Sequence, residues 1–385
     1  MLKVHFLNVG HGDCTIIEPP SGRLTMIDIN NSQDFDDATR EDLLEQETAR
    51  LATLSHPSPM NGGALGAIPS PGRRSLLADL LAPPAAPTPR SSVSELFGAI
   101  PAPPARSPIE GGIGAYLFPT HPLTLSALAR QAEEARRSVE AKGKRELTDP
   151  IEYMKRVFPG KSLWRFVLTH PDLDHMRGLA RLKREIGFAN FWDTGNAKRV
   201  PSFRSEADRE DWAFYQARRR EPRALTLTRG STGFAFNRDA QGFAGGDGIE
   251  ILSPTPWLVD DCNRRECFND ISVVLRIRHA GISILLGGDA EKVAWDDMVR
   301  HYGAGLKSHV LKASHHGRDS GYHMEAVRHI APGLTVMSVG GRPETDASAK
   351  YKRFSGEVAT TRRHGDIQVH VEDDGRAIWQ GSRPA

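Results

Sequence analysis

Four side chains that can bind a metal ion are spaced over six residues of this sequence, namely His170, Asp172, Asp174 and His175. An apolar run at 164–168 precedes them and predicts a buried strand, and apolar residues recur at helical spacing over 176–186 after them. We therefore expect a strand-to-helix loop that turns alternating side chains toward one point. Mixed imidazole and carboxylate ligands suit Zn²⁺ or Mn²⁺. The alternative is an exposed acidic turn whose two histidines have ordinary structural partners.

Two later segments place further metal-binding groups after strands. Asp289 follows a predicted strand at 282–286 and two glycines, and His315 and His316 follow another strand at 310–311. If these strand ends converge with the loop, six or seven ligands meet, which is enough for two divalent metal ions. We expect the carboxylate of Asp289 to bridge the two ions.

The amino-terminal segment predicts two strands joined by a turn at Gly10 and Gly12, because glycine allows backbone angles that other residues resist. Asp13 and Asp28 stand at strand ends. They either hydrogen-bond to the metal-binding loop or only cap turns, and the sequence leaves both interpretations open.

Several other elements are predicted along the chain. Helices are expected at 123–146 and from Asp149-Pro150 onward, and hairpins are expected at 272–286 and 367–379. Trp212 and the arginines at 218–220 form a basic-aromatic segment, which either meets phosphates and bases or forms a solvated helix face. An open basic groove with these arginines would favour a polymeric substrate, whereas a closed pocket would favour a small molecule.

Residues 52–112 differ in composition from the rest, because proline-rich pieces alternate with glycine and serine. This composition predicts an insertion of low order within a single domain that spans 1–385. The insertion is interpreted either as a disordered loop or as a lid, and its short apolar pieces could dock on a partner protein.

Bulk properties limit the possible classes of protein. The chain has 385 residues and a formal net charge of +2, which neither requires nor excludes a nucleic-acid partner. Three cysteines are too few for a disulfide scaffold, and Cys262 and Cys267 either pair or remain reduced. We see no signal-peptide pattern and no apolar run long enough to span a membrane, so we expect a cytoplasmic protein without a membrane partner.

Taken in order, these segments resemble the metallo-β-lactamase superfamily, and most of all the branch that includes the nuclease domain of the DNA-uptake protein ComEC. The resemblance rests on the segment 6–13, the strand-final Asp28, the loop 170–175, Asn269 with Ser272, Gly288-Asp289, and Leu311-Lys312 with the histidine pair. It covers most of the chain outside the insertion and implies an α/β fold, an αββα sandwich with metals at one edge.

The resemblance also implies roles for individual residues. His170 and Asp172 would hold one ion, Asp174 and His175 the other, and Asp289 would bridge them. His315 and His316 would complete the ligand shells or contact a substrate phosphate. Two positions depart from the superfamily pattern, since Asp172 stands where a histidine is usual, and Ser253 stands where relatives often have another histidine.

The implied activity is metal-dependent hydrolysis of a phosphodiester in DNA or RNA by a metal-activated water. Asp174 is expected to orient the water and accept its proton, and His316 or His364 to protonate the leaving oxygen. Lys312, Arg318 and Ser320 could contact the substrate. Two alternatives remain: hydrolysis of a small phosphodiester or ester, and a regulatory or binding protein whose site has decayed.

Overall fold

The structure is a computed structural model that describes residues 1–33, 35, 37–55, 125–222, 224–232, 247–338 and 346–383. The chain divides into two compact units, and the unit made of Met1–Leu43 and Val139–Ala385 contains both large sheets. The other unit, Leu44–Ser138, includes parts of helices α1 (Asp37–Ser55) and α3 (Leu125–Glu146). From residue 56 onward the predicted insertion lies outside the described residues, and the single-domain assignment stays a prediction.

The first sheet has eight strands, which are β1 (Leu2–Phe6), β2 (Thr15–Glu18), β3 (Thr25–Ile27), β5 (Leu163–Val167), β7 (Phe188–Asp193), β8 (Ala224–Thr226), β15 (Ile367–Val371) and β16 (Ala377–Gly381). Their order in the sheet is β16-β15-β1-β2-β3-β5-β7-β8. Strands β3, β5, β7 and β8 run parallel to one another, so their carboxyl ends lie at one edge. The remaining neighbours pair antiparallel.

The second sheet has six strands, which are β9 (Ile249–Ser253), β10 (Val274–His279), β11 (Ile282–Leu286), β12 (Val310–Lys312), β13 (Leu334–Met337) and β14 (Glu357–Thr360). Strands β9, β10 and β11 are antiparallel neighbours, whereas β11, β12, β13 and β14 are parallel. The carboxyl ends of β11 and β12 therefore also lie side by side.

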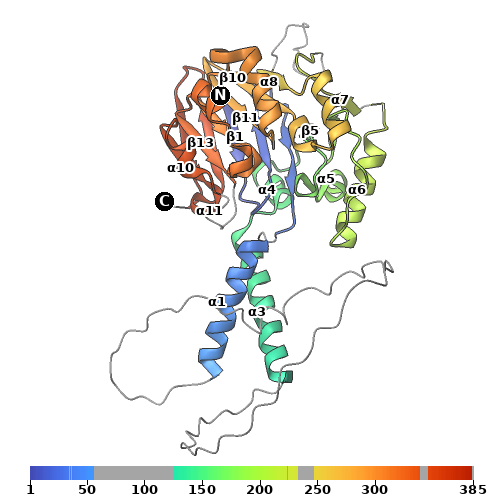
Figure 1. Ribbon diagram of the computed structural model, residues 1–385, viewed down its shortest axis with the longest axis vertical. Helices are drawn as coiled ribbons and strands as arrows, with labels where there is room; N and C mark the ends of the chain where they lie inside the picture. Colours follow the sequence, from blue (N-terminus) through green and yellow to red (C-terminus); the bar gives the residue numbers. More distant parts are fainter. Residues whose placement is uncertain are drawn as a thin grey trace, which may run out of the picture. The chain divides into compact units, whose positions relative to one another are not determined.

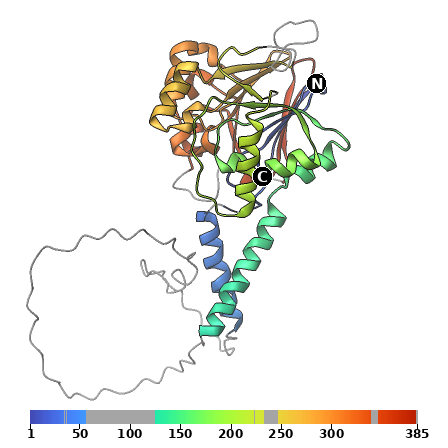
Figure 2. The ribbon, with the colours of Figure 1, turned by 90° about the vertical axis from the view of Figure 1, so that its right-hand side faces the viewer.

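Three separate apolar cores show that the two sheets and their helices form four layers. The first core lies between the sheets and joins, for example, Val4 of β1 to Ile277 of β10 and Val336 of β13. The outer face of the first sheet packs on α4 (Pro150–Val157), α5 (Leu179–Glu185) and α6 (Glu206–Arg218). The outer face of the second sheet packs on α7 (Pro256–Arg265), α8 (Lys292–Tyr302) and α9 (Met324–Ile330). Figures 1 and 2 show the strands between these two groups of helices, and the predicted αββα class is confirmed.

Alternation of side chains explains how one strand serves two cores. In β11, Ile284 and Leu286 belong to the core between the sheets, whereas Leu285 belongs to the outer core under the helices. Successive residues of a strand point to opposite faces, so strands covered on both sides are apolar throughout. This is why the continuous apolar runs of the sequence predicted buried strands correctly.

The predicted elements agree with the structure in most places. The strand expected at 164–168 is β5, and the expected hairpins are β10 with β11 and β15 with β16. Asp149 caps α4 by accepting hydrogen bonds from the backbone of Ile151 and Glu152. The helix expected at 176–186 begins only at Leu179, because Met176–Arg177 forms strand β6 against β4 (Ile29–Asn30).

Among the helices that the structure describes, none is long and apolar enough to cross a membrane.

Candidate metal centre

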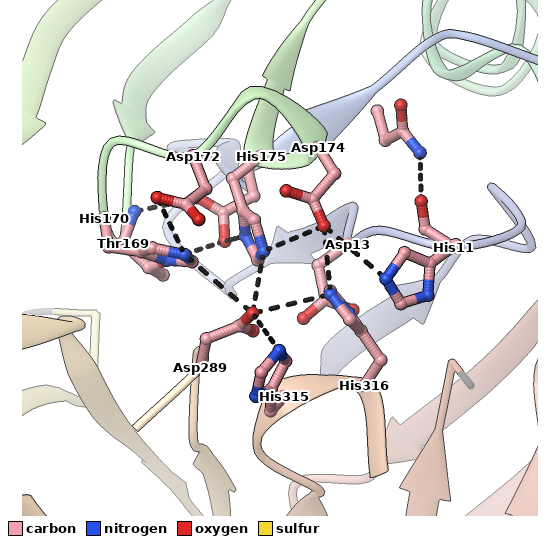
Figure 3. A network of polar contacts seen from close by, with 12 residues as sticks. His11, Asp13, Thr169, His170, Asp172, Asp174, His175, Asp289, His315 and His316 are labelled. Atoms are coloured by element: carbon pink, nitrogen blue, oxygen red, sulfur yellow. Dashed lines mark hydrogen bonds and ion pairs between the residues drawn. The ribbon is translucent and has the colours of Figure 1, made fainter. Parts of the chain in front are cut away.

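The carboxyl ends of four strands bring the chemically active side chains together. Asp28 follows β3, and the loop at 169–175 follows the neighbouring strand β5. Asp289 follows β11 of the other sheet, and His315 and His316 follow the neighbouring β12. Figure 3 shows these side chains pointing toward one another from both sheets. The predicted convergence of three strand ends is present, with β3 as a fourth.

The tightest cluster contains four atoms, Oδ2 of Asp174, Nε2 of His175, Oδ2 of Asp289 and Nε2 of His316, which we call the first ligand set. Nε2 of His175 lies 3.2 Å from Oδ2 of Asp289, and Nε2 of His316 lies 3.4 Å from the same oxygen. Oδ2 of Asp174 lies 3.3 Å from Nε2 of His316 and 3.9 Å from Nε2 of His175. Ligands about 2.0–2.2 Å from a tetrahedral ion are about 3.3–3.6 Å apart, so this set has the right spacing for one ion.

A looser cluster surrounds His170 and shares Asp289 with the first set. Nε2 of His170 lies 3.8 Å from Oδ1 of Asp172 and 3.8 Å from Oδ2 of Asp289. We call His170, Asp172 and Asp289 the second ligand set. Asp172 also forms a close ion pair with Lys198, which neutralises its carboxylate inside the protein. An ion at this second position must compete with Lys198 for Asp172.

His315 lies beside the shared carboxylate, with Nε2 3.8 Å from Oδ2 of Asp289. Its other ring nitrogen, Nδ1, lies 2.9 Å from Oε1 of Glu291 and 2.7 Å from the hydroxyl of Ser320. Ser320, expected to bind substrate, is therefore placed where it orients His315.

Asp28 holds the metal-binding loop in place. Its carboxylate accepts hydrogen bonds from the backbone N–H and the hydroxyl of Thr169 at 2.8 and 2.7 Å, and it lies 2.8 Å from Nδ1 of His175. A carboxylate on the outer nitrogen of a ligand histidine fixes the orientation of the ring and strengthens the ligand. Of the two interpretations of Asp28, contact with the loop is the correct one.

Asp13 supports His316 from the opposite side and is itself held by Lys312. Oδ1 of Asp13 accepts hydrogen bonds from Nζ of Lys312 at 2.6 Å and from the hydroxyl of Ser338 at 2.5 Å, and it lies 3.4 Å from Nδ1 of His316. Lys312 is only 4% exposed. The structure places this lysine in an internal ion pair, although the sequence suggested contact with a substrate.

His364, the second proposed proton donor, lies elsewhere. It ends the short helix α11 (Thr361–His364), its Nδ1 lies 3.0 Å from the carbonyl of Thr360, and its ring packs edge-on against Trp379. No contact within the described part of the chain joins it to either ligand set. His316, the first proposed donor, is fully buried in the first ligand set.

His11 was not among the predicted site residues, yet it belongs to the cluster. Its Nε2 lies 3.9 Å from Oδ2 of Asp174, and its ring meets that of His316 edge-on at 4.6 Å. Asn30 fixes the turn by donating a hydrogen bond to the carbonyl of His11 at 2.5 Å. The sequence signal was a histidine between two glycines after a strand, and both glycines do adopt positive φ angles.

The electrostatics show how the site balances its charges. Burial by itself would raise the pKa of Asp289 and lower that of His175, but their mutual attraction reverses both directions. For His316, burial opposes the charged form, yet Asp289 and Asp13 raise its pKa to about 9. Burial lowers the pKa of His170, which favours a neutral imidazole there. The carboxylates thus demand positive charge, which histidine protons or metal ions can supply.

Atoms without hydrogen-bond partners support the metal interpretation. Nε2 of His170 and Oδ1 of Asp289 are buried and have no hydrogen-bond partner within the described residues. Leaving such groups unsatisfied costs about 1–3 kcal/mol each, and a coordinated ion would satisfy them. The donor set of imidazole nitrogens and carboxylate oxygens fits Zn²⁺ or Mn²⁺.

A further group that could hold an ion lies apart from these sets. Cys262, Cys267 and Asp270 each offer one ligand atom, and these atoms lie within 4.8 Å of one another. Both thiols are free of disulfide bonds, in agreement with the reduced state that the sequence left open.

A cavity of about 1040 Å³ opens beside the first ligand set. His11, Asp174 and Arg318 line it next to the set, and residues of α5 and α6 line the rest. Arg218 and Arg219, which the sequence suggested for a basic groove, are instead engaged with Glu221 and Asp193.

Solved structures similar to this chain include three with partial superposition. The metallo hydrolase Igni18 of the archaeon Ignicoccus hospitalis is 14% identical over 57% of this chain and 79% of its own, with a TM-score of 0.31. The metallo-β-lactamase fold protein YhfI of Bacillus subtilis is 11% identical over 60% and 84%, with a TM-score of 0.32. The β-hydroxylase CmlA is 10% identical over 55% and 45%, with a TM-score of 0.33.

No protein-family model matches the sequence, and no curated protein matches it either. The resemblance to the ComEC branch therefore stays a prediction. Superpositions of this size do not assign a function, which has to be argued from the geometry of the site itself.

Proposed function

We propose that this protein is a metal-dependent hydrolase that cleaves phosphodiester bonds, with DNA or RNA as its substrate. The observation that carries the proposal is the first ligand set, in which four atoms from three separate strand ends stand at the spacing of one coordinated ion. The shared carboxylate of Asp289 adds a second position beside it.

Asp174, His175, Asp289 and His316 would hold the first ion, and His170, Asp172 and Asp289 the second. When bound, divalent ions lower the pKa of water and offset negative charge on a phosphoryl oxygen. We expect tighter binding at the first position, because its ligand atoms are closer together and Lys198 competes for Asp172 at the second.

The protein's own groups account for the proton transfer and for orientation. The site contacts of Asp174 use Oδ2, so Oδ1 can accept a proton from the attacking water at the mouth of the cavity. His11 lines the same cavity and is placed to contact the leaving group or a phosphate oxygen. Asp28 and Asp13 hold His175 and His316 from behind, which keeps the ligand geometry fixed before substrate arrives.

The test is hydrolysis of single-stranded DNA, double-stranded DNA, RNA and bis(p-nitrophenyl) phosphate by the full chain with Mn²⁺ or Zn²⁺. Wild type should cleave at least one nucleic acid, and Asp289→Asn should lose activity by more than about 100-fold, beyond the usual effect of outer partners of a metal. Asp373→Asn, on an exposed side chain, is the matched control.

The possible results separate the alternatives. Turnover of the small diester without cleavage of any nucleic acid would favour a small-molecule hydrolase. A chain that binds no metal and cleaves nothing would contradict the proposal and favour a regulatory protein.

A further inference from the structure

Arginines are the prominent charged residues of the cavity beside the metal centre. Six of them line it, namely Arg40, Arg177, Arg181, Arg184, Arg204 and Arg318. Carboxylates also line it, among them Asp208 and Glu210. The question is therefore which arginine retains binding capacity for a ligand.

Three of these arginines already have carboxylate partners inside the protein. Arg177 pairs with Asp208 at 2.8 Å, Arg181 with Asp149 at 2.8 Å, and Arg184 with Glu210 at 3.6 Å. Their charge is largely neutralised, so they shape the cavity wall more than they attract an anion.

Arg318 differs from these three in both partners and position. No hydrogen bond or ion pair of its guanidinium is found within the described part of the chain, and its Nε is buried without a partner. It lies two residues after His316, and it lines the cavity together with His11 and Asp174. An orphaned buried N–H is costly, so this side chain is prepared for a ligand.

The main chain around Arg318 is fixed even though its side chain has no partner among the described residues. Its N–H donates to the carbonyl of His315 at 2.9 Å, and its carbonyl accepts from the N–H of Gly321 at 3.2 Å. A β-bridge joins it to Asp346. The guanidinium therefore projects from an anchored backbone.

We propose that Arg318 binds the phosphate next to the scissile one in a nucleic-acid strand that lies in this cavity. A guanidinium suits this task because its planar fork donates two parallel hydrogen bonds to a phosphate. The scissile phosphate itself must lie over Asp174 and Asp289. Within the described residues Arg318 makes no ion pair with either carboxylate, which places it beyond that point and along the cavity.

This inference rests on the proposed function and narrows it, because a phosphate beside the scissile one exists only in a substrate with several phosphodiester links. The probes are a short fluorescein-labelled single-stranded DNA and bis(p-nitrophenyl) phosphate, which has no neighbouring phosphate. Binding of the DNA is measured by fluorescence anisotropy with Ca²⁺ in place of Mn²⁺, and turnover of the small diester with Mn²⁺.

Arg318→Gln should weaken DNA binding by about 10- to 100-fold, the usual range for losing charged hydrogen bonds. It should leave turnover of the small diester and the metal content unchanged. Arg318→Lys keeps the charge but loses the fork, and it should recover part of the binding. Arg328→Gln, an exposed arginine of α9 away from the cavity, is the control and should bind like wild type.

DNA binding that is unchanged in Arg318→Gln would overturn the inference, as would wild type that does not bind the DNA. Loss of small-diester turnover in a folded, metal-loaded Arg318→Gln would also overturn it, because Arg318 would then act at the scissile phosphate. Arg318-dependent binding without any cleavage would support the inference while the proposed hydrolase function fails. Cleavage that does not depend on Arg318 would do the reverse.

Discussion

Asp289 is the residue on which both ligand sets depend, since its Oδ2 lies within 3.2–3.8 Å of His175, His316, His170 and His315. It can do so because Gly287 and Gly288 precede it. A Cβ on Gly287 would lie 2.2 Å from Oγ of Ser314, so the loops after β11 and β12 approach more closely than a side chain would permit. Close packing of two loops thus brings the carboxylate to the histidines.

Asp28→Asn tests the support of His175. Asparagine tolerates the positive φ of 55° at this position, so the fold should be kept. It cannot provide the charged acceptor for Nδ1 of His175, and we expect metal affinity to fall by about 10- to 100-fold. Isothermal titration of the chelator-treated protein with Zn²⁺ measures this directly. Equal affinities in the variant and in wild type would show that Asp28 only caps its turn.

At the residue scale, sequence could predict local clusters better than distant contacts. The loop at 169–175 was recognised because its ligands are close in sequence and lie between two periodic segments. The contacts of Asp172 with Lys198 and of Asp13 with Lys312 join residues 26 and 299 positions apart. Such pairs depend on the order of strands in the sheets, which side-chain periodicity does not specify.

At the scale of elements, the turn between β1 and β2 packs directly against the metal-binding loop. Gly12 has a φ of 139°, and a Cβ there would lie 2.7 Å from the carbonyl oxygen of Asp174 and 2.4 Å from Nδ2 of Asn30. Gly12→Ala should therefore displace the loop and reduce both metal affinity and activity by about 10-fold or more.

Gly22→Ala is the matched control for this substitution. Gly22 also has a positive φ, 74°, but a Cβ added there would meet no atom of the described residues within 4 Å. The variant should lose about 1 kcal/mol of stability from backbone strain while keeping its metal affinity. If both variants bind metal like wild type, the packing of the turn on the loop does not hold the ligands in place.

The packing of β1 on α4 predicts a pH dependence of stability. His5 is buried there, with Nδ1 2.9 Å from the hydroxyl of Tyr153 and its ring edge-on to Phe158. Burial, together with His370 and Lys3, lowers the pKa of His5 from 6.5 to about 4. The unfolded chain therefore binds this proton more readily, and stability should fall as the pH drops from 6.5 toward 4, by up to about 3 kcal/mol.

His5→Gln keeps a hydrogen-bonding group beside Tyr153 but cannot titrate. Its free energy of unfolding in urea, measured without metal between pH 7 and about 4.5, should fall less steeply than that of wild type. The difference between the two curves isolates His5 from the other titrating groups. Parallel curves would mean that His5 is not held neutral in the folded protein.

Elements were predictable where one periodicity dominates. The strand at 282–286 was predicted to the residue, because its apolar run is bounded by a turn on one side and by two glycines on the other. The helix after the metal-binding loop was predicted too early, since Met176 and Arg177 fit a helical pattern but pair with β4 as a strand. Pairing with a distant segment overrode the local preference.

At the scale of the whole molecule, the four layers explain why the ligands come from distant parts of the chain. The first sheet presents the carboxyl ends of β3 and β5, and the second presents those of β11 and β12. The apolar core between the sheets holds these ends together at one place. Neither half of the ligand sets is complete without the other sheet.

The most direct test is the position of bound metal in crystals of the protein grown with Mn²⁺, located by anomalous diffraction. We predict a strong peak about 2.0–2.2 Å from Asp174, His175, Asp289 and His316, and a weaker one beside His170 and Asp172. An ion bound only at Cys262, Cys267 and Asp270, or no ion between the sheet edges at saturating metal, would contradict the account.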